Sequence, residues 1–149
     1  MRAGFGLFLA ILLLDSVAAA QPACPPDSVT VTAAGDTITV RHDNAERNCC
    51  SPLAITVQTQ GFVVDFIEGE PEPWCRCTCC FHMLYAASGF APGHYWVRVW
   101  DEAQSVLFGE DEVDVVGGSG AITVGALDRG ECTVSVGPQS WSAVRVLYR

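Results

Sequence analysis

The sequence contains no lysine, so its eight basic residues are all arginines, set against 17 aspartates and glutamates for a formal net charge of −9. A chain this acidic is a poor partner for the phosphate backbone of nucleic acids, and we predict that it binds none. Charged residues are scarce, at 17%, whereas hydrophobic residues make up 50% of the chain. That composition excludes an intrinsically disordered protein.

The sequence also lacks the common motifs of catalysis and cofactor binding. It has no phosphate-binding glycine loop, no dinucleotide fingerprint and no zinc-protease helix motif. The segment 117–121 only approximates a nucleophile elbow, and its glycines indicate a linker. The acidic runs at 68–72 and 110–114 do not match the spacing of a calcium loop, and such runs are usually solvated. We therefore predict a non-enzymatic protein with no catalytic residue and no cofactor.

Long hydrophobic runs are absent except near the N-terminus. There, an apolar run of roughly ten residues from Phe5 to Leu14 follows Met1-Arg2 and precedes the small residues Ala18 to Ala20. This arrangement predicts a cleavable signal peptide at 1–20. The run is too short to span a bilayer with ease, and we predict no membrane span elsewhere in the chain.

The predicted leader and the cysteine content together indicate a compartment. Eight cysteines in so short a chain are typical of an oxidising environment. We predict a secreted protein, or one of the periplasm or cell envelope. A lipid anchor on Cys24 is the less favoured alternative, because Gln21 replaces the aliphatic residue of the bacterial lipoprotein pattern.

Strand patterns run through the mature chain, and no window shows sustained helical periodicity. We predict strands at 28–33, 38–40, 53–58, 62–67, 75–87, 95–99, 106–116, 122–127, 133–136 and 143–148, with a Gly- and Pro-containing loop at 68–74. Turn signals at short intervals in such a chain favour a β-sandwich or a β-barrel.

About 129 residues remain after the leader, which suits one domain. We predict a β-sandwich at 21–116. The segment 117–149 is too short to hold a core of its own, so we expect it to dock on the same domain as extra C-terminal strands.

Residues 81–99 resemble a segment of a known family. Residues 90–99 read FAPGHYWVRV, which resembles the Leu-x-Pro-Gly-x-Tyr-x-Val-x-Val corner of secreted bacterial immunoglobulin-like and fibronectin-III-like modules, with Phe90 in place of the leucine. The cysteine pair 49–50 and the Cys-x-Cys-x-Cys at 75–79 are similar to those of uncharacterised Cys-rich secreted bacterial proteins that share this corner. Cys80 and Cys132 depart from that pattern.

The resemblance covers residues 24 to about 101. It implies an all-β fold, an immunoglobulin-like antiparallel β-sandwich, in which the hydroxyl of Tyr95 bonds to backbone upstream as a tyrosine corner. It implies little about function, because this architecture hosts many unrelated roles. We predict a structural or binding module whose partner is a protein or a carbohydrate.

The cysteines carry the most informative chemistry. If the stretch from Cys75 is a strand, alternate cysteines project from one face and cannot easily bridge each other, so each needs a partner from elsewhere in the fold. Cys80 would point to the opposite face, and the economical pairing joins it to Cys132 in the tail. The remaining cysteines would then meet as two groups of three: Cys24, Cys49 and Cys50 with Cys75, Cys77 and Cys79. Eight cysteines allow 105 connectivities, so the individual pairs stay open.

A soft-metal site is the competing interpretation of the same cysteines. A Cys-x-Cys pair can chelate zinc or copper, with further ligands from elsewhere in the chain. The candidate ligands are Cys49, Cys50, Cys75, Cys77, Cys79, His42 and Glu68. We favour structural disulfides, because free thiols in an oxidising compartment are usually consumed.

One strand face carries a candidate binding surface. Trp96, Arg98 and Trp100 alternate with the core-facing Tyr95 and Val97. An exposed ladder of this kind would offer a stacking platform for a sugar ring or a partner side chain. The plainer interpretation, which we favour, is an arginine held between the tryptophan rings by cation–π contact, or a ladder that the tail covers.

Overall fold

A computed structural model describes residues 24–72, 75 and 77–132. These residues form eight strands and no helix, and hence no helix able to cross a membrane. The predicted signal peptide and the predicted strands at 133–136 and 143–148 lie outside the described residues. The strands are β1 (Ser28–Ala34), β2 (Thr37–Asn48), β3 (Ala54–Gln60), β4 (Val63–Gly69), β5 (Thr78–Ser88), β6 (Gly93–Asp101), β7 (Leu107–Val115) and β8 (Thr123–Asp128).

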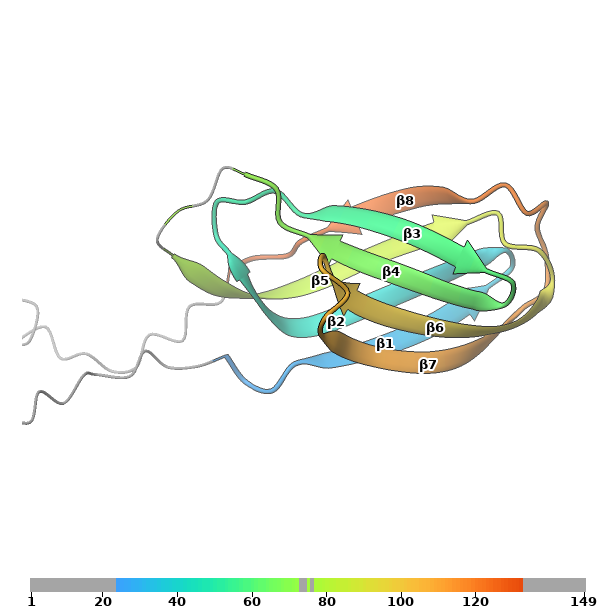
Figure 1. The fold of residues 1–149 in the computed structure, drawn as a ribbon, viewed down its shortest axis with the longest axis horizontal. Coiled ribbons are helices and arrows are strands. Elements are labelled where there is room, and N and C mark those ends of the chain that lie inside the picture. Colours follow the sequence, from blue (N-terminus) through green and yellow to red (C-terminus); the bar gives the residue numbers. More distant parts are fainter. Residues whose placement is uncertain (1–23, 73–74, 76, 133–149) are drawn as a thin grey trace, which may run out of the picture.

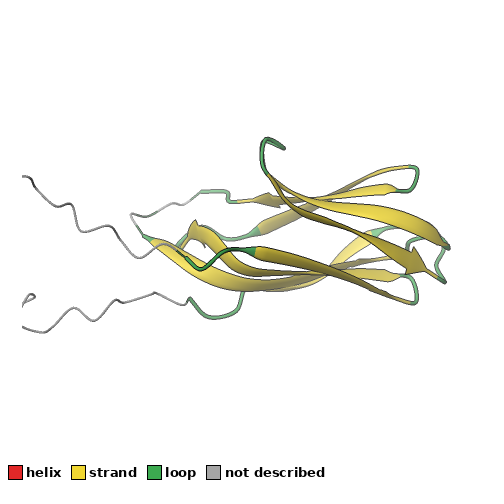
Figure 2. Cartoon of the chain, turned by 90° about the horizontal axis from the view of Figure 1, so that it is seen from below, coloured by secondary structure: helices red, strands yellow, loops and turns green. Residues whose placement is uncertain are grey.

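The strands are divided equally between two sheets, as predicted for a two-layered all-β protein (Figures 1 and 2). One sheet has the order β1-β2-β5-β8 and the other the order β3-β4-β6-β7. In both sheets, alternate residues point inward and build one apolar core. Its fully buried members include Ile38, Val40, Val64, Phe66, Met83, Tyr85, Val97 and Val99.

The second sheet is mixed, so the prediction of an antiparallel sandwich throughout is wrong at one pair. Strand β4 runs parallel to β6, from the pair Val63 and Trp96 to the pair Glu68 and Asp101. The cause is the path of the chain between them. Strand β5 crosses to the other sheet and returns the chain to the end where β4 began, so β6 sets out in the direction of β4.

Several strand boundaries differ from the predicted ones near one end of the sandwich. Strand β2 continues to Asn48 through a bulge between His42 and Ala45, where Asn44 adopts a φ of 61°. Strand β4 includes Glu68, which the sequence placed in a loop. Strand β5 begins at Thr78 and leaves Cys75 and Cys77 before it. The cysteines therefore do not form one continuous alternating row.

The two sheets approach closely where β1 lies beside β7. A Cβ atom added to Gly109 of β7 would lie only 2.6 Å from Cβ of Val29 in β1, so this approach requires glycine. The amide of Val116 also donates to the carbonyl of Gly35 at 3.1 Å, which links the end of β7 to the β1–β2 turn.

The corner before β6 has the predicted tyrosine contact. The hydroxyl of Tyr95 donates to the carbonyl oxygen of Ala91 at 2.9 Å. The ring of Tyr95 packs edge-on against Phe62 and Phe90, with ring centroids 5.4 and 5.5 Å away. Phe62 belongs to the turn between β3 and β4, so these aromatic contacts lie at the end of the sandwich at which β3 turns into β4.

The described part of the tail belongs to the first sheet. Strand β8 pairs antiparallel with β5, from Leu84 and Asp128 to Ser88 and Thr123. It therefore lies in the layer opposite to the one that carries Trp96.

Candidate functional site

All eight cysteines are joined in four disulfides, none of them left free. The pairs are Cys24–Cys80, Cys49–Cys77, Cys50–Cys75 and Cys79–Cys132. A disulfide-stapled sandwich is thereby confirmed, as is the expectation that the pair 49–50 meets the cysteines at 75–79. This covalent framework fits an oxidising environment.

The predicted bond between Cys80 and Cys132 is wrong, and so is the grouping of Cys24 with the core-facing cysteines. Cys80 is bonded to Cys24, and Cys132 is bonded to Cys79. Cys79 lies in the core cluster and Cys80 does not, so the two neighbours in β5 do face opposite sides, as the alternation predicts. The sequence does not reveal which terminal segment passes over which face. In the structure the N-terminal segment reaches the outer face, and the segment after β8 reaches the core-facing residue.

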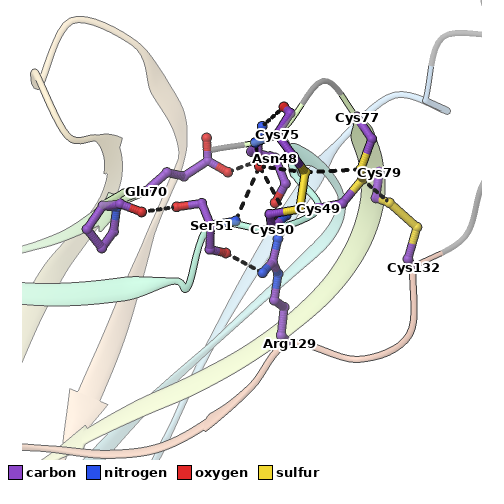
Figure 3. Close-up of a disulfide and its surroundings, with 11 residues drawn as sticks. Asn48, Cys49, Cys50, Ser51, Glu70, Cys75, Cys77, Cys79, Arg129 and Cys132 are labelled. Carbon is purple, nitrogen blue, oxygen red and sulfur yellow. Dashed lines mark hydrogen bonds between the residues drawn. A yellow bond between two sulfur atoms is a disulfide. The ribbon is translucent and has the colours of Figure 1, made fainter. Parts of the chain in front are cut away.

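Asn48 organises the loops that carry four of the cysteines (Figure 3). Its side-chain oxygen accepts the backbone amides of Cys50, Ser51 and Cys75 at 3.0, 3.2 and 3.2 Å, and its side-chain amide donates to the carbonyl of Cys75 at 2.6 Å. The amide of Cys49 donates to the carbonyl of Cys77 at 3.2 Å. The two cysteine loops are thus paired through the backbone as well as through sulfur.

Arg129 lies beneath the same loop, just after β8 (Figure 3). Its guanidinium donates to the carbonyl oxygens of Asn48 and Ser51 and stacks on the ring of Phe81, with 3.9 Å from Cζ to the ring centroid. Its Nε is buried and has no hydrogen-bond partner among the described residues. A positive charge is therefore fixed below the backbone that carries Cys49 and Cys50.

The sulfurs of different disulfides lie in contact with one another. Sγ of Cys49 is 2.8 Å from Sγ of Cys79, and Sγ of Cys75 is 3.6 Å from Sγ of Cys77. Two sets of three sulfurs each fall within 4.8 Å of one another: Cys49, Cys77, Cys79 and Cys50, Cys75, Cys77. Cys77 belongs to both sets.

His42 and Glu68, the two other predicted metal ligands, are turned toward each other and not toward the cysteines. Both side chains are fully buried, and Nδ1 of His42 lies 3.0 Å from Oε1 of Glu68. Glu68 also accepts from the hydroxyl of Tyr85 at 2.6 Å and from the guanidinium of Arg47. Among the described residues, the groups of side chains spaced to hold a metal contain cysteine only.

The environment of Glu68 keeps it ionised. Burial by itself would raise its pKa, but the hydrogen bond from His42, the charges of His42 and Arg47 and the hydrogen bond from Tyr85 outweigh burial, so the pKa lies below its ordinary value. Burial and the Glu68 carboxylate together raise the pKa of Tyr85 far above its ordinary value, so this phenol stays a hydrogen-bond donor. The cluster is a paired buried charge that ties β2, β4 and β5 together.

A cavity of about 250 Å³ opens beside this cluster. Arg47 supplies its basic side chain, and Phe108, on which the Arg47 guanidinium stacks at 4.5 Å, forms part of the wall. The other lining residues are Glu68, Glu70, Asp101, Glu102 and Ala103. Asp101 is already engaged, because it accepts from the amides of Ser105 and Val106 and from the Ser105 hydroxyl. Among the residues that the structure describes, the lining contains no Ser, Cys or Lys.

The predicted tryptophan ladder lies on the outer face of the second sheet. Arg98 makes a two-pronged ion pair with Asp65 of β4, at 2.8 and 2.9 Å, and stacks over the ring of Trp100 at 5.4 Å. Nε1 of Trp100 donates to the same aspartate at 2.8 Å. The expected cation–π contact is thus present with one tryptophan only, and the described tail does not cover the ladder.

Trp96 is the open member of the ladder. Its side chain is 47% exposed, and its Nε1 donates to Glu110 at 3.1 Å, which fixes the orientation of the ring. Strand pairing places Trp96 in a row with Gln60 and Val63 on one side and Glu112 on the other. The rim of this face carries two further acidic residues, Asp114 and Glu112, both hydrogen-bonded to His94. These hydrogen bonds raise the pKa of His94.

Sequence reasoning missed the buried Glu68 cluster and the role of Asn48. Glu68 alternates with other acids before a Pro-rich segment, which is typical of a solvated loop. One signal was available: His42 shares the inward face of its strand with Ile38 and Val40, so it needs a buried partner. No local pattern identifies that partner, because it lies 26 residues away.

A scan against models of known protein families, a search of curated proteins and a search of solved structures found no match to this chain.

Proposed function

We propose that this protein is a secreted, non-enzymatic module that binds carbohydrate through the outer face of the sheet β3-β4-β6-β7. The observation that carries the proposal is Trp96. A large aromatic ring is left almost half exposed on a strand, while its indole nitrogen is held by Glu110 and its neighbour Arg98 is held by Asp65. An aromatic ring fixed in this way loses little conformational entropy on binding.

The groups around Trp96 suit a sugar ring. Its open face can stack against the C–H face of a pyranose, and the flanking Gln60 and Glu112 can bond to hydroxyl groups. The acidic side chains on this face, Asp65, Glu110, Glu112 and Asp114, disfavour an anionic polysaccharide. Neutral sugars or amino sugars are therefore the expected ligands.

The immunoglobulin-like character of the sandwich and its export are part of the same proposal. The tyrosine corner at Tyr95 supports kinship with immunoglobulin-like modules, although the parallel pair of β4 and β6 departs from their antiparallel pattern. The disulfides support assembly outside the cytoplasm. Expression of the full chain in a bacterium should yield an extracytoplasmic product that begins at Gln21 and lacks free thiols.

The binding proposal is tested on an array of neutral, amino and acidic oligosaccharides with the mature protein. We expect binding to neutral or amino sugars, with Trp96→Ala weakening it at least about tenfold, or about 1.4 kcal/mol. Leu84→Ala is the matched control, because Leu84 is similarly exposed, at 46%, but lies in the other sheet. The Leu84→Ala variant should bind the sugar with the affinity of the wild type.

Two results would contradict the binding proposal. One is that the protein binds no sugar on the array, above all if it instead binds a protein partner through another face. The other is tryptophan fluorescence that acrylamide quenches equally in the wild type and in Trp96→Phe, which would mean that Trp96 is covered.

Soft-metal binding is the second candidate function, and one observation favours it. Two sets of three sulfurs lie within 4.8 Å of one another. Because these sulfurs are bonded in pairs in the oxidised protein, only a reduced form would offer thiolates as ligands.

A further inference from the structure

We propose that reduction of three disulfides converts the cysteine end of the sandwich into a site for two copper(I) ions bridged by the thiolate of Cys77. The inference rests on the second candidate function and specifies the ion, the number of ions and the ligands. One ion would be held by Cys49, Cys77 and Cys79, and the other by Cys50, Cys75 and Cys77. Since Cys77 is common to both sets, its sulfur is the bridge.

The sulfurs would stay close after reduction, because hydrogen bonds that do not involve sulfur hold their backbones together. Asn48 joins the loop of Cys50 to Cys75, and the amide of Cys49 donates to the carbonyl of Cys77. Cys79 is anchored within β5, where it pairs with Arg47 of β2. The three-sulfur sets are therefore positioned by the fold as well as by the disulfides.

The ligand set selects the ion. Both groups consist of sulfur alone, and the buried His42 and Glu68 bond to each other instead. Thiolates favour soft ions such as copper(I) and zinc. Zinc in a structural site takes four ligands in a tetrahedron, whereas each set here offers three. Copper(I) accepts three thiolates in a plane, so it fits both sets.

Charge and exposure are favourable for the reduced state. The guanidinium of Arg129 is fixed against the carbonyls of Asn48 and Ser51, next to Cys49 and Cys50, and its charge favours thiolate over thiol. Cys50 and Cys77 are exposed, so a reductant can reach both disulfides that they form. The third disulfide is reached through Cys132, which is exposed, although its partner Cys79 is only 4% exposed. The disulfide of Cys24 with Cys80 contributes no sulfur to either set.

The redox step is balanced by a dithiol reductant. Each of the disulfides Cys49–Cys77, Cys50–Cys75 and Cys79–Cys132 accepts two electrons and two protons and becomes two thiols, while one dithiol is oxidised to its own disulfide. Copper(I) then displaces the protons of the five ligating thiols to solvent. Copper is not itself oxidised or reduced.

The test counts copper on the mature protein. The protein is reduced with dithiothreitol, passed through gel filtration under nitrogen, and titrated with copper(I) in competition with bicinchoninate. We expect two copper ions per chain in the wild type. Cys75→Ser and Cys79→Ser each remove one set and should each bind one ion. The double variant Cys24→Ser/Cys80→Ser, which leaves both sets intact, should bind two.

A second measurement does not depend on how the variants fold. Iodoacetamide should leave Cys49, Cys50, Cys75, Cys77 and Cys79 unmodified in the copper-loaded wild type and modify Cys132, as read by peptide mass spectrometry. Cys24 and Cys80 should be recovered as an intact disulfide. Far-ultraviolet circular dichroism should show that the reduced, copper-loaded chain keeps its sheet. Protection of Cys132 equal to that of the five ligands, alkylation of any of the five, or loss of the sheet would overturn the assignment.

The remaining outcomes separate this assignment from the second candidate function. No bound copper and no bound zinc would end both. One copper per chain, or zinc bound in preference to copper, would end the two-copper assignment and leave soft-metal binding standing. Two coppers retained in both Cys75→Ser and Cys79→Ser would show that other ligands are used.

Discussion

The two ends of the sandwich are held together by different means. At one end, where β2, β4 and β8 finish and β5 begins, four disulfides join segments that are 25 to 56 residues apart in sequence. At the other end, the described residues contain no cysteine, and the contacts are aromatic packing around Tyr95 and backbone hydrogen bonds between turns.

The difference follows from how the chain passes through each end. At the aromatic end, strands β1 and β2, and β3 and β4, are joined by tight turns at Gly35 and Gly61, so each pair of strands is held together by a short connection. At the cysteine end, the segments that meet are distant in sequence: the loop after β2, the residues before β5 and the segment after β8. Disulfides there join segments that no tight turn holds together.

The largest effect should come from removing one long-range disulfide. Cys24→Ala/Cys80→Ala opens a loop closed by a bond between residues 56 apart, which should lower the free energy of unfolding by about 4 kcal/mol. The measurement is urea unfolding of the purified variant beside the wild type. If the two proteins unfold at the same urea concentration, the cysteine end is held by packing after all, and the contrast between the two ends is wrong.

The buried carboxylate near the cysteine end should give the next largest effect. Glu68→Gln leaves the guanidinium of Arg47 without its buried counter-charge and should cost about 3 kcal/mol at neutral pH. Because the pKa of Glu68 is lowered in the folded state, the stability that its ionisation confers is present above the ordinary value of 4.5 and is lost as the pH falls through the folded value.

The pH dependence supplies the control for Glu68. Urea unfolding at neutral pH and at about pH 3 should show the difference between wild type and Glu68→Gln shrinking in acid. A difference that stays constant between the two pH values would mean that Glu68 stabilises the fold by its shape and not by its charge.

The smallest effects compare one substitution at two places in the sandwich. Tyr95→Phe removes a hydrogen bond to a carbonyl at the aromatic end and should cost about 1 kcal/mol. Tyr85→Phe removes a donor to a buried charged group and should cost about 2 kcal/mol. The same unfolding assay measures both variants. Equal losses would show that the charge of Glu68 adds nothing to the hydrogen bond from Tyr85.

The sequence predicts most strands because their alternation is a local property. Residues 28–34, 54–60 and 93–101 each show an apolar face that needs no knowledge of distant partners. The tyrosine corner is expected from the resemblance of residues 90–99 to immunoglobulin-like modules, and its hydrogen bond is also local, since Tyr95 and Ala91 are four residues apart.

What the sequence does not predict depends on contacts between distant segments. The parallel pairing of β4 with β6 depends on how β5 crosses between the sheets. The burial of Glu68 depends on His42, Arg47 and Tyr85, and the partners of Cys79 and Cys80 depend on where the two terminal segments cross. Trp96 could be identified as a candidate, but its exposure depends on the sheet that β8 joins.

The two longest-range disulfides end on adjacent residues of one strand. Cys24 is bonded to Cys80 and Cys132 to Cys79, so an unbroken line of covalent bonds runs from one segment to the other through a single peptide link. Tension applied to the two ends of the chain would travel along this line and bypass the sheets. While both bonds are intact, the body between residues 24 and 132 would transmit a pulling force without its strands being drawn apart.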